Sequence, residues 1–305
     1  MTSPEQAVDA INAVYHGPPG HRALHAKGRF YAATFTASAE ATIRCRAAHL
    51  QGTPVPTVVR LSNGSGHVKS IDRAPDVRGL AVSFRPEVGA ATDLLGQTAP
   101  RFPVHTVAEF VELTRASALA PRKPWLLPAF LARHPSAIPA MAANLRAGAV
   151  NPRRSFAAAT YYAVHAYRWL DGDGGPLWVR YTWLPERGVE PGPKPDRSDS
   201  DYLQHEFVSR LSDGPVRFTL SVQIAGDGDD PHDPTSVWRS PNRIDAGTLE
   251  ITAPDPERET GGELIVFDPT RVIDGIELSD DPILRFRPLA YSVSAERRAG
   301  LRRLS

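Results

Sequence analysis

An arginine and a tyrosine four residues apart stand near the end of the 305-residue chain, in the segment RFRPLAYSVSAERR. On a helix, Arg287 and Tyr291 would share one face. A phenol titrates at about pH 10 and a guanidinium keeps its charge, so an arginine beside the phenol oxygen favours the phenolate. The pair is therefore suited to binding ferric iron, although an arginine stacked on an exposed tyrosine would have the same spacing.

A basic segment near the amino terminus, HRALHAKGRF at residues 21–30, contains a second candidate, His25. A neutral imidazole accepts and returns protons near neutral pH, so His25 could move a proton during a reaction. A histidine that merely belongs to a basic loop would look the same. The segment alone leaves both interpretations open.

Composition and the remaining motifs exclude several classes of function. The net charge of +1 gives no reason to expect nucleic acid or an anionic membrane as partner. No apolar run approaches the roughly 20 residues of a membrane span, and the first residues do not resemble a signal peptide. Cys45 is the only cysteine, which excludes an internal disulfide and favours a reducing, cytoplasmic location. SNGSG at 62–66 is not a nucleophile elbow, and zinc-protease and Walker motifs are absent.

Hydrophobic periodicity predicts many strands, with helices at the start, middle and end of the chain. Strands are expected at 29–36, 57–62, 79–84, 176–184, 215–224 and 247–252. The segment 215–224 alternates strictly, with apolar residues at 216, 218, 220, 222 and 224. This pattern favours an α+β fold, in which an antiparallel β-barrel or large antiparallel sheet carries helical segments around it.

Capping patterns place the helices. Ser3 and Gln6 predict a capping box for a helix over 3–15, and Thr106 and Glu109 predict another for a helix that begins there. Apolar residues at helical spacing indicate a helix over 203–211, and the Pro- and Ala-rich segment 121–147 suits short helices or an extended excursion. A final helix is expected over about 288–303, with Pro288 in its first turn.

Six segments, taken in order, resemble the haem catalase family: ALHAKGRF, VVRLSNGSG, APDVRGLAVSF, DLLGQTAPRFPV, DPTSVW and FDPTRVIDGIELSDDPILRFRPLAY. That family carries a Val-His-Ala-Lys-Gly segment, an Arg-Phe-Ser segment, a Gly-Asn-Asn-Thr-Pro segment and an Arg-x-x-x-Tyr pair. The resemblance runs from about residue 20 to residue 300. It implies an antiparallel β-barrel of the catalase type, a single haem-binding domain over 1–305, and haem b as cofactor.

The resemblance also implies roles for individual residues. Tyr291 would be the axial iron ligand, and Arg287 would hold it as phenolate. His25 would be the distal base, Ser62 would orient it, and Gln97 would take the place of the family's Asn. The other cofactor-binding positions would be Arg22, Arg60 and Arg298 for the haem propionates, and Phe102 and Phe110 for the pocket wall. His165, in YYAVHAY, is expected to be structural.

Several departures from the family pattern modify the expected activity. Besides Gln97, the chain has Leu61 where Phe is usual, and PDVRG lacks the first Arg of the family's segment. Only 24 residues precede His25 and 14 follow Tyr291, which resembles the minimal, catalase-related peroxidases. The expected function is a haem peroxidase that reduces hydrogen peroxide or organic peroxides with a small organic electron donor. Catalase activity would be weak, and the protein would be a monomer or homodimer.

Two alternatives use the same resemblance. Fatty-acid hydroperoxide lyases of the allene oxide synthase type share the fold, but those relatives tend to have a Thr immediately before the distal His, where this chain has Leu24. A non-enzymatic haem-binding protein would need Tyr291 but would have no use for His25 and Ser62.

Overall fold

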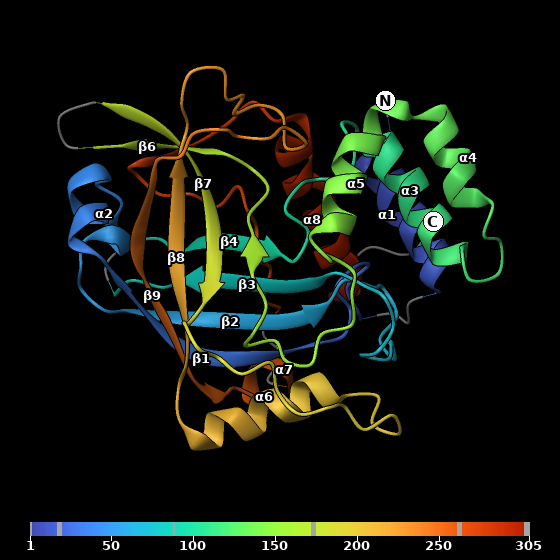
Figure 1. The fold of residues 1–305 in the computed structure, drawn as a ribbon, viewed down its shortest axis with the longest axis horizontal. Helices are drawn as coiled ribbons and strands as arrows, with labels where there is room; N and C mark the ends of the chain where they lie inside the picture. Colours follow the sequence, from blue (N-terminus) through green and yellow to red (C-terminus); the bar gives the residue numbers. More distant parts are fainter. Residues whose placement is uncertain (1, 17–19, 88, 172–174, 261–263, 302–305) are drawn as a thin grey trace.

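The computed structural model (Figure 1) describes residues 2–16, 20–87, 89–171, 175–260 and 264–301. Its centre is an antiparallel sheet in the order β10-β6-β7-β5-β4-β3-β2-β1-β9-β8, and an additional β7–β8 pairing closes the part from β7 to β8 into a barrel. The strands are β1 Gly28–Ala37, β2 Val55–Asn63, β3 Arg78–Phe84, β4 Thr92–Gln97, β5 Tyr161–Tyr162, β6 Tyr167–Leu170, β7 Pro176–Pro185, β8 Val216–Ile224, β9 Arg243–Pro254 and β10 Ile276–Leu278. The predicted antiparallel barrel is thus confirmed.

The strands that sequence periodicity predicted all form, with ends that shift by a few residues. In β8 the apolar side chains at 216, 218, 220 and 222 are buried as predicted, but Ser221 and Gln223 on the other face are buried as well. Gln223 donates to the carbonyl of Ser240, 2.8 Å away, which satisfies its amide. Four strands were not predicted, because β5, β6 and β10 are only two to four residues long and β4 begins with the polar pair Thr92 and Asp93.

Helices gather on one side of the barrel, where α1, α3, α4, α5 and α8 lie together, while α2 lies at the opposite side and α6 along β1 (Figure 1). The α-helices are α1 Pro4–Tyr15, α2 Ala39–Arg44, α3 Val107–Leu119, α4 Leu126–Arg133, α5 Ile138–Arg146, α6 Tyr202–Asp213, α7 Glu257–Thr260 and α8 Pro282–Arg298, with 3-10 turns at Ala48–Leu50 and Pro135–Ala137. Both predicted capping boxes, Ser3 with Gln6 and Thr106 with Glu109, are present. None of the helices described is long and apolar enough to cross a membrane.

The predicted start of the last helix is wrong. Helix α8 begins at Pro282, not at Pro288, because the Asp281 carboxylate accepts the backbone N–H groups of Ile283 and Leu284 and caps the helix there. Pro288 therefore lies inside the helix. The helix ends at Arg298, and residues 302–303 of the predicted span lie outside the described residues.

The barrel interior is filled by aromatic side chains. Phe35, Phe84 and Trp183 form a fully buried cluster whose ring centroids lie 5.0–6.5 Å apart. Helix α6 is joined to the same core through Phe207, whose ring lies 4.9 Å from that of Tyr31 in β1. This packing gives the strands a rigid frame, on whose helical side the candidate site is built.

Gly247 offers a test of the barrel packing. Its φ is +154°, and a Cβ there would lie 2.5 Å from the Thr36 carbonyl oxygen and 2.6 Å from a Phe35 ring carbon. Gly247→Ala should lower the free energy of unfolding by about 3 kcal/mol, since strain and overpacking add. Gly228→Ala is the matched control, because Gly228 also has a positive φ, +81°, but open space around it. Denaturant unfolding of both variants gives the comparison, and equal losses would contradict this account of β9.

Candidate functional site

His25 lies in the loop between α1 and β1 and has an uncommon backbone conformation. Its φ of 53° is in the left-handed region, which costs free energy for a residue other than glycine. The loop is held in place by backbone bonds from His25 N–H to the Gly64 carbonyl and from Ala26 N–H to the Ser65 carbonyl, both 3.0 Å. The side chain is directed at β2, where His25 Nδ1 lies 3.0 Å from Ser62 Oγ. The predicted pairing of His25 with Ser62 is confirmed.

Arg60, two residues before Ser62 in β2, also binds the His25 loop. Its guanidinium donates to the carbonyls of His25 (2.9 Å) and Ala26 (3.2 Å), and only 5% of the residue is exposed. The Phe30 ring lies against two guanidinium groups, that of Arg60 at 5.7 Å and that of Arg22 at 5.8 Å. Arg22 also donates to the Ile265 carbonyl at 2.7 Å. Sequence reasoning assigned both arginines to haem propionates and missed that Arg60 shapes the His25 backbone.

The register of the barrel places Gln97 on the same row as Ser62. Ser62 pairs with Gly79 in β3, and Gly79 pairs with Gln97 in β4. Directly paired residues point to the same face of a sheet, so Ser62 and Gln97 face the same side, two strands or roughly 10 Å apart. Between them Gly79 leaves room, since a Cβ there would come within 2.8 Å of both His25 Nδ1 and Ser62 Oγ. The predicted distal residues thus share one wall.

Burial keeps the His25 imidazole neutral. Its pKa is lowered from 6.5 to about 3, mainly by desolvation and in addition by the positive charges of Arg60, Arg287 and Arg22. A neutral imidazole can accept a proton at any pH well above 3. The charge of Arg287 also acts on His25, so Arg287 in α8 lies near the His25 loop, and segments from both ends of the chain meet in one region.

A chain of polar contacts leads from Asp281 through His165 to Arg287, which lies over the Tyr291 ring. Asp281 Oδ2 lies 2.5 Å from His165 Nδ1, and His165 Nε2 lies 2.7 Å from Arg287 Nη1. Arginine can only donate, so His165 Nε2 must accept, and the ring hydrogen must then be on Nδ1, directed at Asp281. Burial lowers the pKa of His165, which agrees with a neutral ring. Each group in the chain therefore has one defined hydrogen-bonding role.

Arg287 and Tyr291 share one face of α8, as their spacing predicted. The guanidinium carbon lies 5.7 Å from the centroid of the Tyr291 ring. The expectation that His165 is structural becomes more specific, because His165 positions Arg287 rather than the barrel strands. Asp281 was not predicted at all, yet it both caps α8 and binds His165. The Asp-Pro pair at 281–282, an N-cap followed by a first-turn proline, was the signal that could have revealed it.

The two predicted pocket phenylalanines pack together beside this chain. The ring centroids of Phe102 and Phe110 are 5.1 Å apart, and Phe102 lies 6.2 Å from the His165 ring. Arg298, at the end of α8, has a buried Nε that no described residue binds, and burial lowers the pKa of its guanidinium. A buried guanidinium nitrogen with unused donor capacity suits an anionic group such as a propionate.

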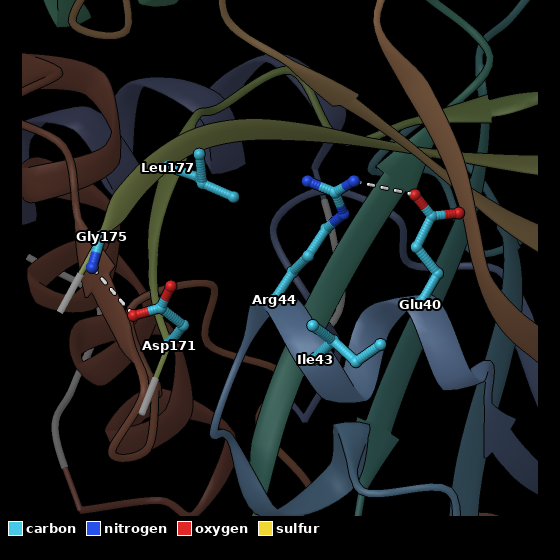
Figure 2. A pocket seen from close by; sticks show the side chains of 6 residues that line it. All are labelled: Glu40, Ile43, Arg44, Asp171, Gly175 and Leu177. Carbon is cyan, nitrogen blue, oxygen red and sulfur yellow. Dashed lines mark hydrogen bonds and ion pairs between the residues drawn. The ribbon is translucent and has the colours of Figure 1, made fainter. Parts of the chain in front are cut away.

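A surface hollow beside α2 has no residue in common with this site. Figure 2 shows its lining, which consists of Glu40, Ile43, Arg44, Asp171, Gly175 and Leu177, around a volume of about 370 Å³. The Arg44 and Glu40 side chains pair with each other at 3.1 Å. Its two carboxylates already accept hydrogen bonds, Glu40 from Arg44 and Asp171 from the Gly175 backbone, so the His25–Tyr291 region remains the candidate site.

Comparison with known proteins agrees with the geometry. The catalase family model matches residues 6–304. A catalase-related peroxidase of Mycolicibacterium paratuberculosis (strain ATCC BAA-968 / K-10) is 44% identical over 99% of this chain and 96% of its own length. Another, of Synechococcus elongatus (strain ATCC 33912 / PCC 7942 / FACHB-805), is 28% identical over 97% of this chain and 88% of its own length.

Solved structures show the same fold. A bacterial catalase matches with a TM-score of 0.77 at 22% identity, over 95% of this chain and 60% of its own. A fungal catalase matches with a TM-score of 0.76 at 19% identity, over 96% of this chain and 62% of its own. The chain thus spans about three fifths of the length of these two catalases, and the barrel is of the catalase type, as predicted. With a family match along nearly its whole length and 44% identity to a catalase-related peroxidase, the protein belongs to the catalase family.

Proposed function

We propose that the protein is a haem-dependent peroxidase that reduces hydrogen peroxide or an organic peroxide with a small organic electron donor. The observation that carries this proposal is that two groups come near each other, Tyr291 with Arg287 over its ring, and a neutral His25 joined to Ser62, since the charge of Arg287 acts on His25. Membership of the catalase family supports haem as the cofactor and peroxide as the substrate. The two catalase-related peroxidases among the relatives support the peroxidase class.

The residues present fit a haem. Tyr291 supplies a phenol oxygen with a fixed cation at its ring, which is the donor type that ferric iron takes in this family. Arg298 offers an anionic edge a buried Nε that is without a partner among the described residues, and Gly79 keeps the wall beside His25 free of a side chain. Bound there, haem would supply an iron centre that peroxide oxidises and that an electron donor then reduces. We assign haem b to this role.

His25 would move the proton that peroxide cleavage requires. If Nδ1 carries its hydrogen toward Ser62 Oγ, 3.0 Å away, then Nε2 has the free lone pair. Nε2 would take the proton from one peroxide oxygen and return it to the other, which leaves as water. The Gln97 amide, on the same wall, would hydrogen-bond a peroxide oxygen and orient it. It is one methylene longer than the family's Asn, which supports weak rather than full catalase activity.

The experiment that tests this function is a stopped-flow reaction of the haem-reconstituted protein with hydrogen peroxide or an organic hydroperoxide, with and without a phenol. We expect peroxide to change the haem absorption spectrum and the phenol to restore it, with stoichiometric oxidation of the phenol. Vigorous oxygen release without phenol would instead indicate a catalase. If no peroxide changes the spectrum, the proposal is wrong.

The role of Tyr291 gives a second prediction. Tyr291→Phe removes the only atom of that side chain that can bind iron, so the affinity for haem should fall by about tenfold or more. An absorbance titration of the haem-free protein with haem measures this. Tyr15→Phe is the matched control, because Tyr15, the last residue of α1, packs edge-on against His67 and should keep normal affinity. Equal affinities of Tyr291→Phe and wild type would show that another residue binds the iron.

The neutral state of His25 gives a third prediction. Because its pKa is about 3, the rate constant of the peroxide reaction should stay constant from about pH 8 down to pH 5, and should fall only as the pH approaches 3. His25→Ala should retain haem but react about 100-fold more slowly or worse. The pH profile of the stopped-flow rate constant tests both statements. A decline centred near pH 6.5 would mean that His25 is hydrated, and an unimpaired His25→Ala would remove its assigned role.

A further inference from the structure

We propose that Asp72 is the positioning residue of the distal site: its buried carboxylate fastens both the His25 segment and the Ser62 segment, and so holds the two partners at their 3.0 Å contact. Asp72 lies in the loop between β2 and β3, and it contacts neither His25 nor Ser62. The proposal rests on the proposed function for its kinetic part, whereas its structural part can be tested without any substrate.

The carboxylate of Asp72 is 1% exposed and binds three groups from three segments. Oδ1 accepts from Lys27 Nζ at 2.7 Å and from Asn63 Nδ2 at 2.8 Å, while Oδ2 accepts the backbone N–H of Leu203 at 2.8 Å. A buried charge is tolerated when it is paired and fully hydrogen-bonded, and removing one partner is then strongly destabilising. Asp72 is therefore a fixed point to which the beginning of β1, the end of β2 and the start of α6 are attached.

Two of those groups belong to the segments of the distal pair. Lys27 follows His25 by two residues, and Asn63 follows Ser62 directly. Their backbones are also joined, since Asn63 N–H donates to the Lys27 carbonyl at 3.0 Å. A single carboxylate oxygen thus binds one side chain from each segment, just beyond the point where His25 and Ser62 meet.

The backbone of His25 needs such support. A left-handed φ at a residue other than glycine persists only when surrounding contacts impose it. Arg60 supplies contacts on the carbonyl side of His25 and Ala26. The Lys27–Asp72 pair anchors the chain immediately after them, so the loop is fixed at both places. Without the anchor, the loop could relax and water could reach the imidazole.

A second carboxylate on Lys27 provides a matched control. Asp201 Oδ1 lies 2.6 Å from Lys27 Nζ, but the Asp201 side chain is 44% exposed, against 1% for Asp72. Among the described residues, Lys27 and Ser200 bind its carboxylate, and neither belongs to β2. Exposed ion pairs contribute little. Asp72→Asn and Asp201→Asn therefore remove the same charge from the same lysine, but only the first weakens the link between the two segments, because the NH2 arm of the amide cannot accept from Lys27, Asn63 or Leu203.

The test compares backbone hydrogen exchange in the haem-free variants, with the β8 amides as internal reference. Asp72→Asn should accelerate exchange of the His25, Ala26 and Asn63 amides by about tenfold or more relative to β8, whereas Asp201→Asn should change it less than about twofold. Should Asp72→Asn not fold, Asn63→Ala decides, because it keeps the Lys27–Asp72 pair. It should accelerate the His25 and Ala26 amides by about threefold.

The pH dependence of the peroxide reaction, measured on the haem-reconstituted variants, separates positioning of His25 from a purely structural role, which would leave it unchanged. Hydration of His25 would raise its pKa from about 3 toward 6.5, even with Arg60, Arg287 and Arg22 still facing it, so in Asp72→Asn the decline of the peroxide rate constant should shift to higher pH. Asp201→Asn should keep the wild-type profile. The proposal is overturned if Asp72→Asn matches wild type in both measurements, or if both aspartate variants behave alike. If wild type itself does not react with peroxide, the proposed function fails, and the exchange data alone decide the role of Asp72.

Discussion

The contact between His165 and Arg287 connects the barrel to the helix that carries Tyr291. A guanidinium beside a phenol is useful only if it cannot turn away, and Arg287 is held by His165, which is itself held by Asp281. Asp281 also caps α8, so the group that fixes the start of the helix fixes the orientation of the arginine one and a half turns later. The position of the helix and the orientation of Arg287, beside the proposed iron ligand Tyr291, therefore depend on one carboxylate.

The distal half depends on a different constraint, the register of the barrel. Pairing of β2, β3 and β4 puts Ser62, Gly79 and Gln97 in one row, and the missing side chain of Gly79 makes space for the imidazole. His25 itself comes from a loop, so its position is not fixed by register. It is imposed by backbone hydrogen bonds to Gly64 and Ser65, which directly follow β2, and by the guanidinium of Arg60. The backbone of His25 is left-handed as a result.

Much of this could be predicted from the sequence. Alternation identified β8, capping boxes identified α1 and α3, and ordered motifs identified the family and brought His25, Ser62 and Tyr291 together. The features that were predicted wrongly or not at all depend on tertiary contacts. The start of α8 was misplaced because two prolines, 282 and 288, both suit a first turn, and only the Asp281 cap distinguishes them. Arg60 also binds the His25 carbonyl, and His165 positions Arg287. These contacts join residues that lie 35 and 122 positions apart in the chain, which no local pattern contains.

The central claim is that Tyr291, held by Arg287, binds ferric haem iron as a phenolate. Resonance Raman spectroscopy of the reconstituted ferric protein, with and without isotope-labelled tyrosine, tests it most directly. The account predicts iron–tyrosinate vibrations that shift with the label and that are present throughout the neutral pH range, because a guanidinium is a fixed positive charge. Vibrations typical of a histidine or water ligand, without any label-sensitive tyrosinate band, would contradict it.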